Sequence, residues 1–481
     1  MKILFATDGR YPEHVNGVSV YVHYLAEEMA NRGHEVHIFH HIHSEFLRRP
    51  RMISTVRDGI RYHGIEHSPT SFSEAMVHPL KSWSEKGTEA LFTQLLDRIQ
   101  PDIVHFHEFE RTPSRCIDIS ADCGIPTLVT LHDYWFICPR CQLFTPDERI
   151  CEGPGDGTHC VSRCLARGFL TRQYRKMTML LPDGVLLRGL KRVRNVYKGI
   201  TGKRLGQAAP RTGSEVHPAV VENSGEAEAY GRRPTLTLGS LARADLVLAV
   251  SSCVKGVFSR HGIDTNKLVV NQLGVKSAEW VTRRRRRFSS YPVRFGFMGH
   301  LGPSKGGHLI IRAAQGIRPG RARFLFFGGA DRETLHDFRN DTEEMPYCSY
   351  EGRYDYRALD RVFDRFDVLI IPSLWQETLG MIGLEAQAAG IPIIASDTGG
   401  MRDYVTHGTN GLLFPVGDAA GLRQCIERIL DHPEMIEDLS CHAIAPKTIP
   451  ENCTEIIGYY ERLRSRDPVH ADHSYAMSVR P

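Results

Sequence analysis

The chain has 481 residues, of which 41% are hydrophobic and 24% are charged, and this balance excludes a wholly disordered chain, a collagen and a coiled coil. Its length predicts two large domains or about three ordinary ones, with enough core to fold without disulfide bonds. No run approaches the roughly 18 apolar residues of a membrane span. The apolar run after Met1 and Lys2 ends at Ala6, which is too short for a secretory signal. We therefore expect a protein of the reducing cytoplasm.

The first part of the chain alternates between strand and helix patterns. A short apolar run over 2–6, followed by an Asp-Gly pair, predicts a buried strand and its exit loop. Apolar residues at 3.6-residue spacing from Val18 to Met29 predict an amphipathic helix that Gly33 ends, and Val36 begins another strand. Further buried strands are predicted at 102–107, 126–130 and 245–250. Strands that alternate with helices favour a parallel, doubly wound α/β sheet.

Residues 165–240 interrupt this alternation. The window 165–204 holds eleven Lys or Arg residues and one acid, Asp183, so it carries +10 whereas the whole chain carries +4. We interpret 165–240 as a long insertion that is partly helical near 169–198 and almost without periodicity over 206–233. A basic block of this kind is typical of a solvated flank, an anionic membrane surface or a polyanion partner.

The α/β alternation restarts after a second basic run, Arg283 to Arg287. That run lies in 276–292, which we interpret as a linker between two domains. Strands are then predicted at 293–298, 324–327, 367–371, 391–395 and 411–414. Helices are predicted at 306–315, 380–389, 418–430 and 451–463. Two successive doubly wound domains fit this pattern, and because such sheets bind ligands at the carboxyl ends of their strands, facing domains would place a site in the cleft between them.

A glycine-rich loop, Gly299 to Gly307, directly follows the strand predicted at 293–298. Its glycines would let the backbone approach an anion, Lys305 would supply a point charge, and the next helix would offer N–H groups. A generic tight turn explains the loop about equally well. Neither a Gly-x-Gly-x-x-Gly motif after a strand nor a Gly-Lys-Ser/Thr motif is present, so a dinucleotide dehydrogenase and a P-loop NTPase lack their main evidence.

Two glutamates follow the strand predicted at 367–371. We expect Glu377 on the loop after that strand and Glu385 eight residues later within the next helix. A Cα separation approaching about 10 Å would let the carboxylates hold different parts of an extended ligand rather than one reacting atom. Backbone N–H groups of 378–380 would point at a phosphate between them. The alternative is one glutamate that complements a helix dipole and one ordinary surface glutamate.

Five of the twelve cysteines fall within 138–164: Cys138, Cys141, Cys151, Cys160 and Cys164. Four thiolates in tetrahedral geometry would suit a structural Zn²⁺ ion. The spacing is not that of a standard zinc ribbon, so free thiols, a disulfide or an iron–sulfur site are the alternatives. A second dense group, made of His37, His40, His41 and His43, has irregular spacing, and we interpret it as loop surface rather than as a metal site.

The sequence resembles the retaining glycosyltransferases of family four, which have the GT-B fold, over nearly its whole length. Four segments carry the resemblance, and they occur in the family's order. They are the loop and helix from Asp8 onward, the His-bearing strand ends 102–107 and 129–132, the Lys305 loop, and the spaced glutamates with the glycine-rich stretch 390–400. The resemblance implies two facing Rossmann-like domains and a final helix that crosses back onto the first.

The resemblance also implies a role for each matching residue. His132 would face the transferred sugar, Glu377 would hold the hydroxyls of the donor sugar, and Lys305 would neutralise the departing diphosphate. Glu385 would bind the ribose. Further donor contacts would come from Gly17, Gly299, His300, Gly352, Arg353, Thr378, Leu379 and Gly380. His107 is interpreted as a wall or core residue.

One position departs from the family pattern. The family usually has arginine directly after the glycine equivalent to Gly299, whereas this chain has His300. A neutral imidazole stabilises a diphosphate less than a fixed guanidinium does. We therefore expect either that activity falls as the pH rises and the imidazole loses its charge, or that another cation such as Arg353 substitutes.

The domain boundaries expected on this basis are 1–275 for the acceptor-side domain, 276–292 for the linker and 293–450 for the domain that binds the nucleotide-sugar. The helix 451–465 would return to the first domain, and 466–481 would form a flexible tail. The Cys-rich loop 138–164 and the basic insertion 165–240 would belong to the first domain.

The expected reaction is transfer of a sugar, with retention, from a nucleotide-diphosphate sugar to a polysaccharide or lipid-linked acceptor in cell-surface glycan synthesis. The leaving phosphate would take the proton of the acceptor, so neither a separate base nor a catalytic metal is expected, and no nucleic acid partner is expected. The enzyme would be cytoplasmic, with the basic insertion resting on the inner face of the membrane. The alternatives are a sugar phosphorylase, a nucleotide-sugar epimerase, or a non-catalytic scaffold of the same fold.

Overall fold

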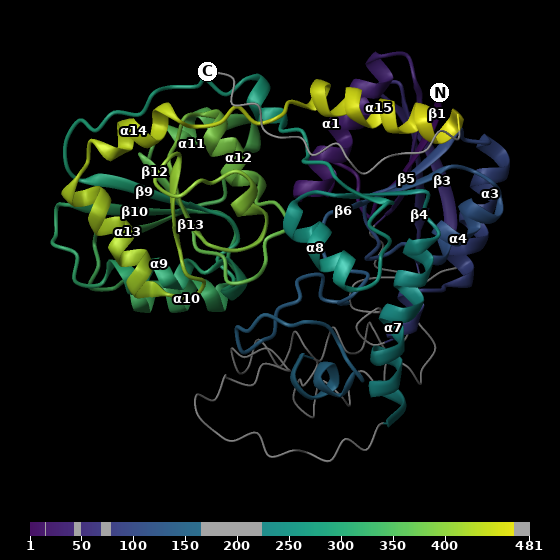
Figure 1. Cartoon of the computed structure of the whole chain (residues 1–481), viewed down its shortest axis with the longest axis horizontal. Helices are drawn as coiled ribbons and strands as arrows, with labels where there is room; N and C mark the ends of the chain where they lie inside the picture. The colour runs from purple at the N-terminus through teal and green to yellow at the C-terminus, as the bar shows by residue number, and fades with distance from the viewer. Residues whose placement is uncertain (15, 43–49, 69–77, 165–223, 466–481) are drawn as a thin grey trace, which may run out of the picture.

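The computed structural model describes residues 1–14, 16–42, 50–68, 78–164 and 224–465, and the structural statements below concern these residues. Figure 1 shows two α/β bodies side by side, one built from the first half of the chain and one from the second. The basic window 165–204, the expected tail 466–481 and His43 lie outside the described residues. No described helix is both long and apolar enough to cross a membrane.

The first body is built on an eight-stranded sheet with the order β3-β4-β2-β1-β5-β6-β7-β8. Every pairing is parallel except that of the edge strand β3 with β4. The strands are β1 (Lys2–Ala6), β2 (Glu35–His41), β3 (Arg51–Arg57), β4 (Ile60–Glu66), β5 (Ile103–Phe106), β6 (Thr127–Leu131), β7 (Leu246–Ala249) and β8 (Leu268–Val270). The direction of winding reverses between β1 and β5, which is where a doubly wound sheet opens a ligand site at its carboxyl edge.

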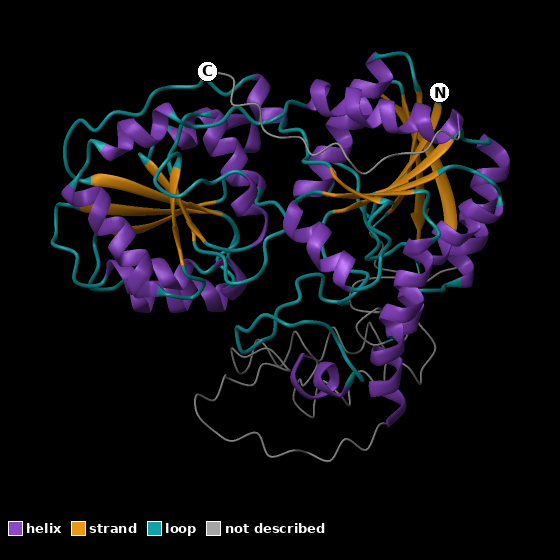
Figure 2. Ribbon diagram, viewed as in Figure 1, coloured by secondary structure: helices purple, strands orange, loops and turns teal. Residues whose placement is uncertain are grey.

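Helices cover both faces of this sheet, as Figure 2 shows. They are α1 (Gly17–Asn31), α3 (Lys86–Ile99), α4 (Arg115–Asp122), α7 (Ser224–Ala242) and α8 (Ser252–Arg260), with short turns η1 (Pro79–Ser82), η2 (Cys160–Cys164) and η3 (Lys276–Glu279). Helix α1 begins where it does because Asn16 and Ser19 form a capping box, in which each side chain accepts a backbone N–H of the other residue.

The second body contains a six-stranded sheet with the order β11-β10-β9-β12-β13-β14, parallel throughout. Its strands are β9 (Val293–Met298), β10 (Ala322–Phe327), β11 (Cys348–Gly352), β12 (Val368–Ile371), β13 (Ile393–Ser396) and β14 (Gly411–Phe414). The flanking helices are α9 (Gly307–Ala314), α10 (Arg332–Asp341), α11 (Leu359–Phe363), α12 (Met381–Ala388), α13 (Ala419–Asp431) and α14 (Met435–Cys441), with turns η4 (Pro303–Lys305), η5 (Tyr356–Ala358) and η6 (Gly399–Asp403). The winding reverses between β9 and β12, so this carboxyl edge also opens at a switch point.

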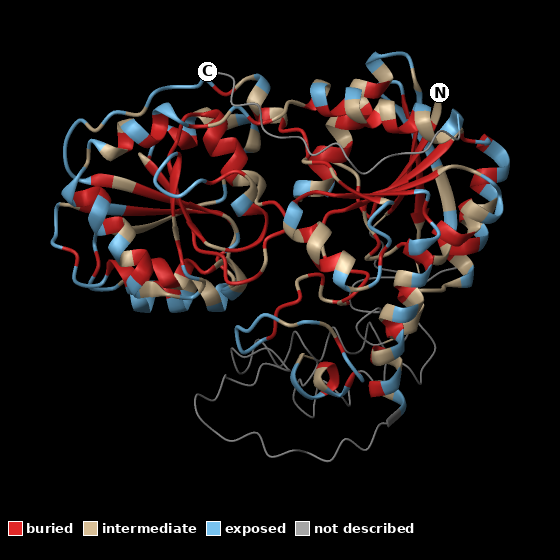
Figure 3. Cartoon of the chain, viewed as in Figure 1, coloured by how far each residue is buried: buried red, intermediate tan, exposed pale blue. Residues whose placement is uncertain are grey.

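Both sheets lie at the centre of their bodies, and Figure 3 shows their strands as mostly buried. Strands of parallel sheets are covered on both faces, and continuous apolar runs such as Ile3 to Phe5 and Val368 to Ile371 reflect this, since each of these residues is 0–6% exposed. The predicted doubly wound α/β fold is confirmed.

The last helix, α15 (Ile449–Ser465), returns to the first body and packs on α1. Two buried hydrogen bonds fix it there. Tyr460 Oη lies 2.6 Å from His105 Nδ1, and Tyr21 Oη donates to Asn452 Oδ1 at 2.7 Å. The crossing helix therefore ties the end of the second body to the first body.

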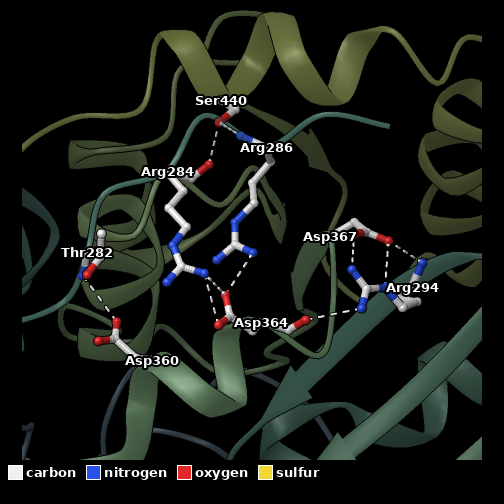
Figure 4. Close-up of polar contacts among 9 residues, drawn as sticks. Thr282, Arg284, Arg286, Arg294, Asp360, Asp364, Asp367 and Ser440 are labelled. Carbon is white, nitrogen blue, oxygen red and sulfur yellow. Dashed lines mark hydrogen bonds and ion pairs between the residues drawn. The ribbon is translucent and has the colours of Figure 1, made fainter. Parts of the chain in front are cut away.

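The arginine run between the bodies is paired within the chain. Arg284 and Arg286 both form ion pairs with Asp364, at 2.9 and 3.6 Å (Figure 4). Arg294 donates hydrogen bonds from Nε and Nη2 to the two carboxylate oxygens of Asp367. The other three residues of the run contact Glu437 or a backbone carbonyl: Arg283, Arg285 and Arg287. The segment thus follows the surface of the second body. Two carboxylates of that body, Asp364 and Glu437, each form ion pairs with two arginines.

Two expectations from the sequence are corrected, and one pair of strands was missed. His37, His40 and His41 are buried residues of β2 rather than loop surface, and His37 Nδ1 lies 2.8 Å from His63 Nε2. The stretch taken as aperiodic up to residue 233 enters a regular helix, α7, at Ser224. The antiparallel pair β3–β4 was not predicted, because β3 is an exposed edge strand whose pattern lacks an apolar face.

Candidate functional site

The loop after β6 and the loop after β12 touch, so the carboxyl edges of the two sheets face each other. Thr378 Oγ1 donates to the backbone oxygen of His132 at 2.8 Å, and both residues are at least nine-tenths buried. A second contact joins the bodies nearby, where Ser252 at the start of α8 donates its N–H to Asp403 Oδ2 at 2.7 Å. Thr378 and His132, which were predicted on different bodies, are therefore brought together.

Glu377 lies at the centre of a compact polar cluster. Its Oε1 atom accepts hydrogen bonds from Lys305 Nζ at 2.5 Å, Ser373 Oγ at 2.9 Å and Trp375 Nε1 at 3.0 Å. Lys305 also lies over the Trp375 ring, 5.5 Å from its centroid. The carboxylate is 5% exposed, so its rotamer is fixed and its charge is neutralised by the lysine.

Two helices begin at this cluster with open N-termini. Helix α9 starts after Gly306 and α12 after Gly380, and neither glycine supplies a side chain to cap the first N–H groups. Gly306 has φ +71°, and a Cβ there would lie 1.9 Å from the backbone oxygen of Pro372, so only glycine fits. Open helix N-termini beside a lysine are suited to an anion, and anion binding by this loop stays a prediction.

Glu385 faces a different set of neighbours within α12. It is buried, and burial raises the pKa of its carboxyl to about 7, while the nearby hydroxyl groups of Tyr356 and Ser277 oppose that rise. Burial raises the pKa of the Tyr354 hydroxyl, and the neighbouring Glu385 carboxylate adds to that rise. Glu377 and Glu385 therefore have different protein neighbours.

His132 lies on the first body, where its backbone oxygen accepts the hydrogen bond from Thr378 of the second. Burial lowers the pKa of its imidazole to about 3, so the ring is neutral at physiological pH. His132 Nε2 lies 3.1 Å from His107 Nδ1, and the ring packs against Tyr21. His107 is itself buried among His105, Phe5 and Tyr21, which agrees with its expected place in the wall.

The remaining predicted residues lie around the same edge. His300 accepts the Gly302 N–H on Nδ1 at 3.0 Å, which leaves Nε2 to carry the proton of the neutral ring. The side chains of His300 and Arg353 both lie next to Gly329, because a methyl group at that position would contact both of them. Gly17 begins α1, and Gly299 and Gly352 have positive φ angles of 151° and 79°. Leu379 is buried.

A group of acidic residues on the first body was missed by the sequence analysis. Asp8 accepts the backbone N–H groups of Glu110 and Arg111, while Glu108 accepts Thr7 Oγ1 at 2.6 Å. Burial raises the pKa of Asp8, helped by repulsion from Glu108 and Glu110, and burial raises the pKa of Asp133 to about 7. Asp8, the two glutamates and Asp133 lie just after the ends of β1, β5 and β6, respectively. No sequence motif joins these residues. The signal that could have predicted the group was that all three strands end at the same edge of the sheet.

The five clustered cysteines do not act as one set. Four of them line a single cavity: Cys138, Cys151, Cys160 and Cys164. The fifth, Cys141, donates its thiol to Glu110 Oε1 at 3.7 Å. The expectation that Cys141 shares a metal site with the other four cysteines is therefore wrong. In the described part of the chain, no three His, Cys, Asp or Glu side chains are already arranged to hold a metal ion.

Comparison with known proteins identifies the family. A model described as Glycosyltransferase Family 4 matches residues 15–185, and one described as Glycosyl transferases group 1 matches residues 279–444. Together they cover more than half of the chain. The chain belongs to the group 1 glycosyltransferases. The second match contains the lysine, both glutamates and both uncapped helices of the cleft.

Curated relatives resemble this glycosyltransferase over part of their length. It is 29% identical over 170 residues to the glycogen synthase of Mycobacterium tuberculosis, a match that spans 35% of this chain and 41% of the relative. It is 30% identical over 235 residues to a GDP-mannose-dependent alpha-mannosyltransferase of the same organism, which spans 47% and 59%. These matches cover less than two thirds of either relative.

Solved structures resemble the glycosyltransferase over nearly its whole length. The sucrose-phosphate synthase of Thermosynechococcus elongatus superposes with a TM-score of 0.63 at 16% identity, covering 96% of this chain and 99% of that one. HepE of Anabaena in complex with UDP gives a TM-score of 0.60 at 15% identity, covering 96% and 100%. At such identities the likeness concerns the fold, and it is the GT-B fold expected from the sequence.

Proposed function

We propose that the protein transfers a sugar, with retention, from a nucleotide-diphosphate sugar to a glycan or lipid-linked acceptor. The observation that carries this proposal is the pairing of Lys305 with Glu377 between the uncapped starts of α9 and α12. The relative HepE was solved with UDP, which supports a nucleoside diphosphate as the common part of the donor.

The diphosphate would occupy the two helix N-termini. Breaking the sugar–phosphate bond builds negative charge on the leaving diphosphate, and fixed N–H groups together with the Lys305 ammonium stabilise that charge without reorganising. Lys305 would then divide its charge between Glu377 and the phosphate. Glu377 would hold donor-sugar hydroxyls through Oε2, because all three of its protein hydrogen bonds fall on Oε1.

The other two roles follow from burial. Glu385 would accept hydrogen bonds from the ribose hydroxyls. These hydrogen bonds would replace the water contacts that its carboxylate loses on burial. His132 would face the anomeric carbon as a neutral ring. The leaving phosphate oxygen would take the proton of the acceptor on the same face, which gives retention.

The test is nucleotide release from a panel of UDP-, GDP- and ADP-sugars, with the anomeric configuration of the product read by NMR. Stimulation by acceptor glycan and an α-linked product from an α-donor are expected, and Glu377→Gln should abolish both. Release that requires inorganic phosphate would indicate a phosphorylase, and interconversion of the donor sugar without transfer would indicate an epimerase. Tight donor binding without turnover by any acceptor would favour the scaffold.

The proposal includes a peripheral membrane location. It rests on the charge of 165–204 alone, because that window lies outside the described residues. Each well-placed cation contributes about 1 kcal/mol at an anionic surface. Sedimentation with anionic liposomes at low salt is expected, and no sedimentation above that of neutral liposomes would exclude this location.

A further inference from the structure

Four thiols converge on one cavity away from the cleft. Cys138, Cys151, Cys160 and Cys164 line it, together with Tyr230 of α7. The cysteines come from three separate parts of the segment 138–164, and all four are free. Because a chain segment with little regular structure brings these four side chains to one place, their convergence calls for a physical reason.

A backbone N–H group is already directed at one of the sulfur atoms, since Gly153 donates its N–H to Cys151 Sγ at 3.4 Å. The same Sγ lies 3.4 Å from the Gly153 carbonyl oxygen, to which the thiol donates in the absence of a metal. Hydrogen bonds to sulfur favour the thiolate over the thiol, so this N–H group would support a metal-bound sulfur at Cys151.

A buried cation beside the cavity provides an independent observation. Arg233 of α7 is 0% exposed, stacks 4.4 Å from the Trp135 ring, and donates Nε to Ser82 Oγ at 2.7 Å. Its Nη2 has no hydrogen-bond partner, and no carboxylate among the described residues pairs with it. The ionisable side chains that act on it most strongly are two thiols, those of Cys138 and Cys141.

An unpaired guanidinium in the interior is costly unless a negative group lies nearby. Asp133 also faces Arg233, but burial raises the pKa of that carboxyl to about 7, so it supplies only part of a charge. Neutral thiols supply none. An anionic metal–thiolate group in the cavity would supply the negative charge that the buried Arg233, with its unpartnered Nη2, lacks.

We propose that Cys138, Cys151, Cys160 and Cys164 bind one Zn²⁺ ion as four thiolates, and that Arg233 balances part of the charge of this centre. Each thiol releases its proton to solvent as its Zn–S bond forms, so the centre carries −2 and no electron is transferred. Since the sulfurs are not yet placed to hold a metal, the ion draws them to about 2.3 Å from itself.

The centre would brace a segment that reaches the donor side. Glu148, within the same segment, lies 3.5 Å from His308 in the first turn of α9. The loop from Cys138 to Cys164 is thus held at its base by the metal and at its tip by the helix that follows Lys305. The proposal does not depend on the proposed reaction, since metal content is measured without substrate.

The experiment is elemental analysis of the full chain purified without a His tag and without added metal. About one Zn per chain is expected in the wild type and in Cys141→Ser, the matched control whose sulfur faces Glu110. Cys151→Ser and Cys160→Ser should each lose most of the zinc. Less than a third of an equivalent in the wild type, stoichiometric iron in place of zinc, or equal loss in Cys141→Ser would overturn the proposal.

A second measurement covers variants that fail to fold. Titration of the wild-type protein with a mercurial thiol reagent, followed by a zinc-sensitive dye, should release one Zn as four thiols react. Arg233→Gln should weaken zinc binding about 10- to 100-fold, as loss of an outer partner of a metal site does, while Arg233→Lys should retain more of it. Reaction of the four thiols without release of metal would contradict the proposal.

Discussion

Replacing Glu385 by glutamine should stabilise the protein at alkaline pH while removing donor binding. The ordinary carboxyl pKa is 4.5, and burial raises that of Glu385 to about 7. A carboxyl whose pKa is raised by folding costs no stability below its ordinary value. The cost grows as the pH rises from 4.5 to 7 and is constant above that range.

The size of the effect follows from the shift. Each pKa unit corresponds to 1.36 kcal/mol, so the buried carboxylate costs at most about 3 kcal/mol at pH 8. Glutamine has nearly the same shape and cannot ionise. The difference in unfolding free energy between Glu385→Gln and the wild type should therefore increase by about 3 kcal/mol between pH 4.5 and pH 8. Comparing the two pH values removes any pH-independent effect of the amide.

The assay is thermal unfolding of both proteins across this pH range, with the gain at pH 8 amounting to roughly 6–12 °C for a domain of this size. A saturating nucleoside diphosphate should close the gap, because the ligand stabilises the wild type alone. A difference that does not change with pH would refute the reasoning, since it would mean that the carboxylate is solvated or already paired.

The other predictions concern the cleft and the linker. Lys305→Met should lower kcat about 10²- to 10³-fold in a nucleotide-release assay, and a loss below threefold would place the diphosphate elsewhere. Thr378→Val should reduce the free energy of unfolding by about 1–2 kcal/mol, measured by urea denaturation, because it leaves the His132 carbonyl unpaired; an unchanged midpoint would contradict the contact. Asp364→Asn should cost about 1 kcal/mol at low salt and less at 1 M salt, because Arg284 and Arg286 lose their shared carboxylate; a loss independent of salt would contradict an ionic origin.

Local patterns predicted the elements on which the site is built. The strands β9 and β14 were predicted to the residue, since short, largely apolar stretches that end at a glycine or a proline identify buried parallel strands. Helix α7 was not predicted beforehand, because glycine, proline and charged residues hide its pattern and long-range contacts of Arg233 hold it in place.

The spatial pairings of the site required the fold. Lys305 and Glu377 are 72 positions apart, and nothing local indicates that they form an ion pair. The separation of Cys141 from the other four cysteines depends on the direction of one side chain toward Glu110. Sequence spacing gives the candidates for a ligand set, whereas the backbone between them decides which sulfurs face the same cavity.

The most direct test of the proposed donor site is a crystal structure with a bound nucleoside diphosphate. We predict density for the two phosphates at the N-termini of α9 and α12 beside Lys305, with the ribose hydroxyls within hydrogen-bond distance of Glu385. A nucleotide bound away from this edge, or a diphosphate that makes no contact with Lys305, would contradict the account.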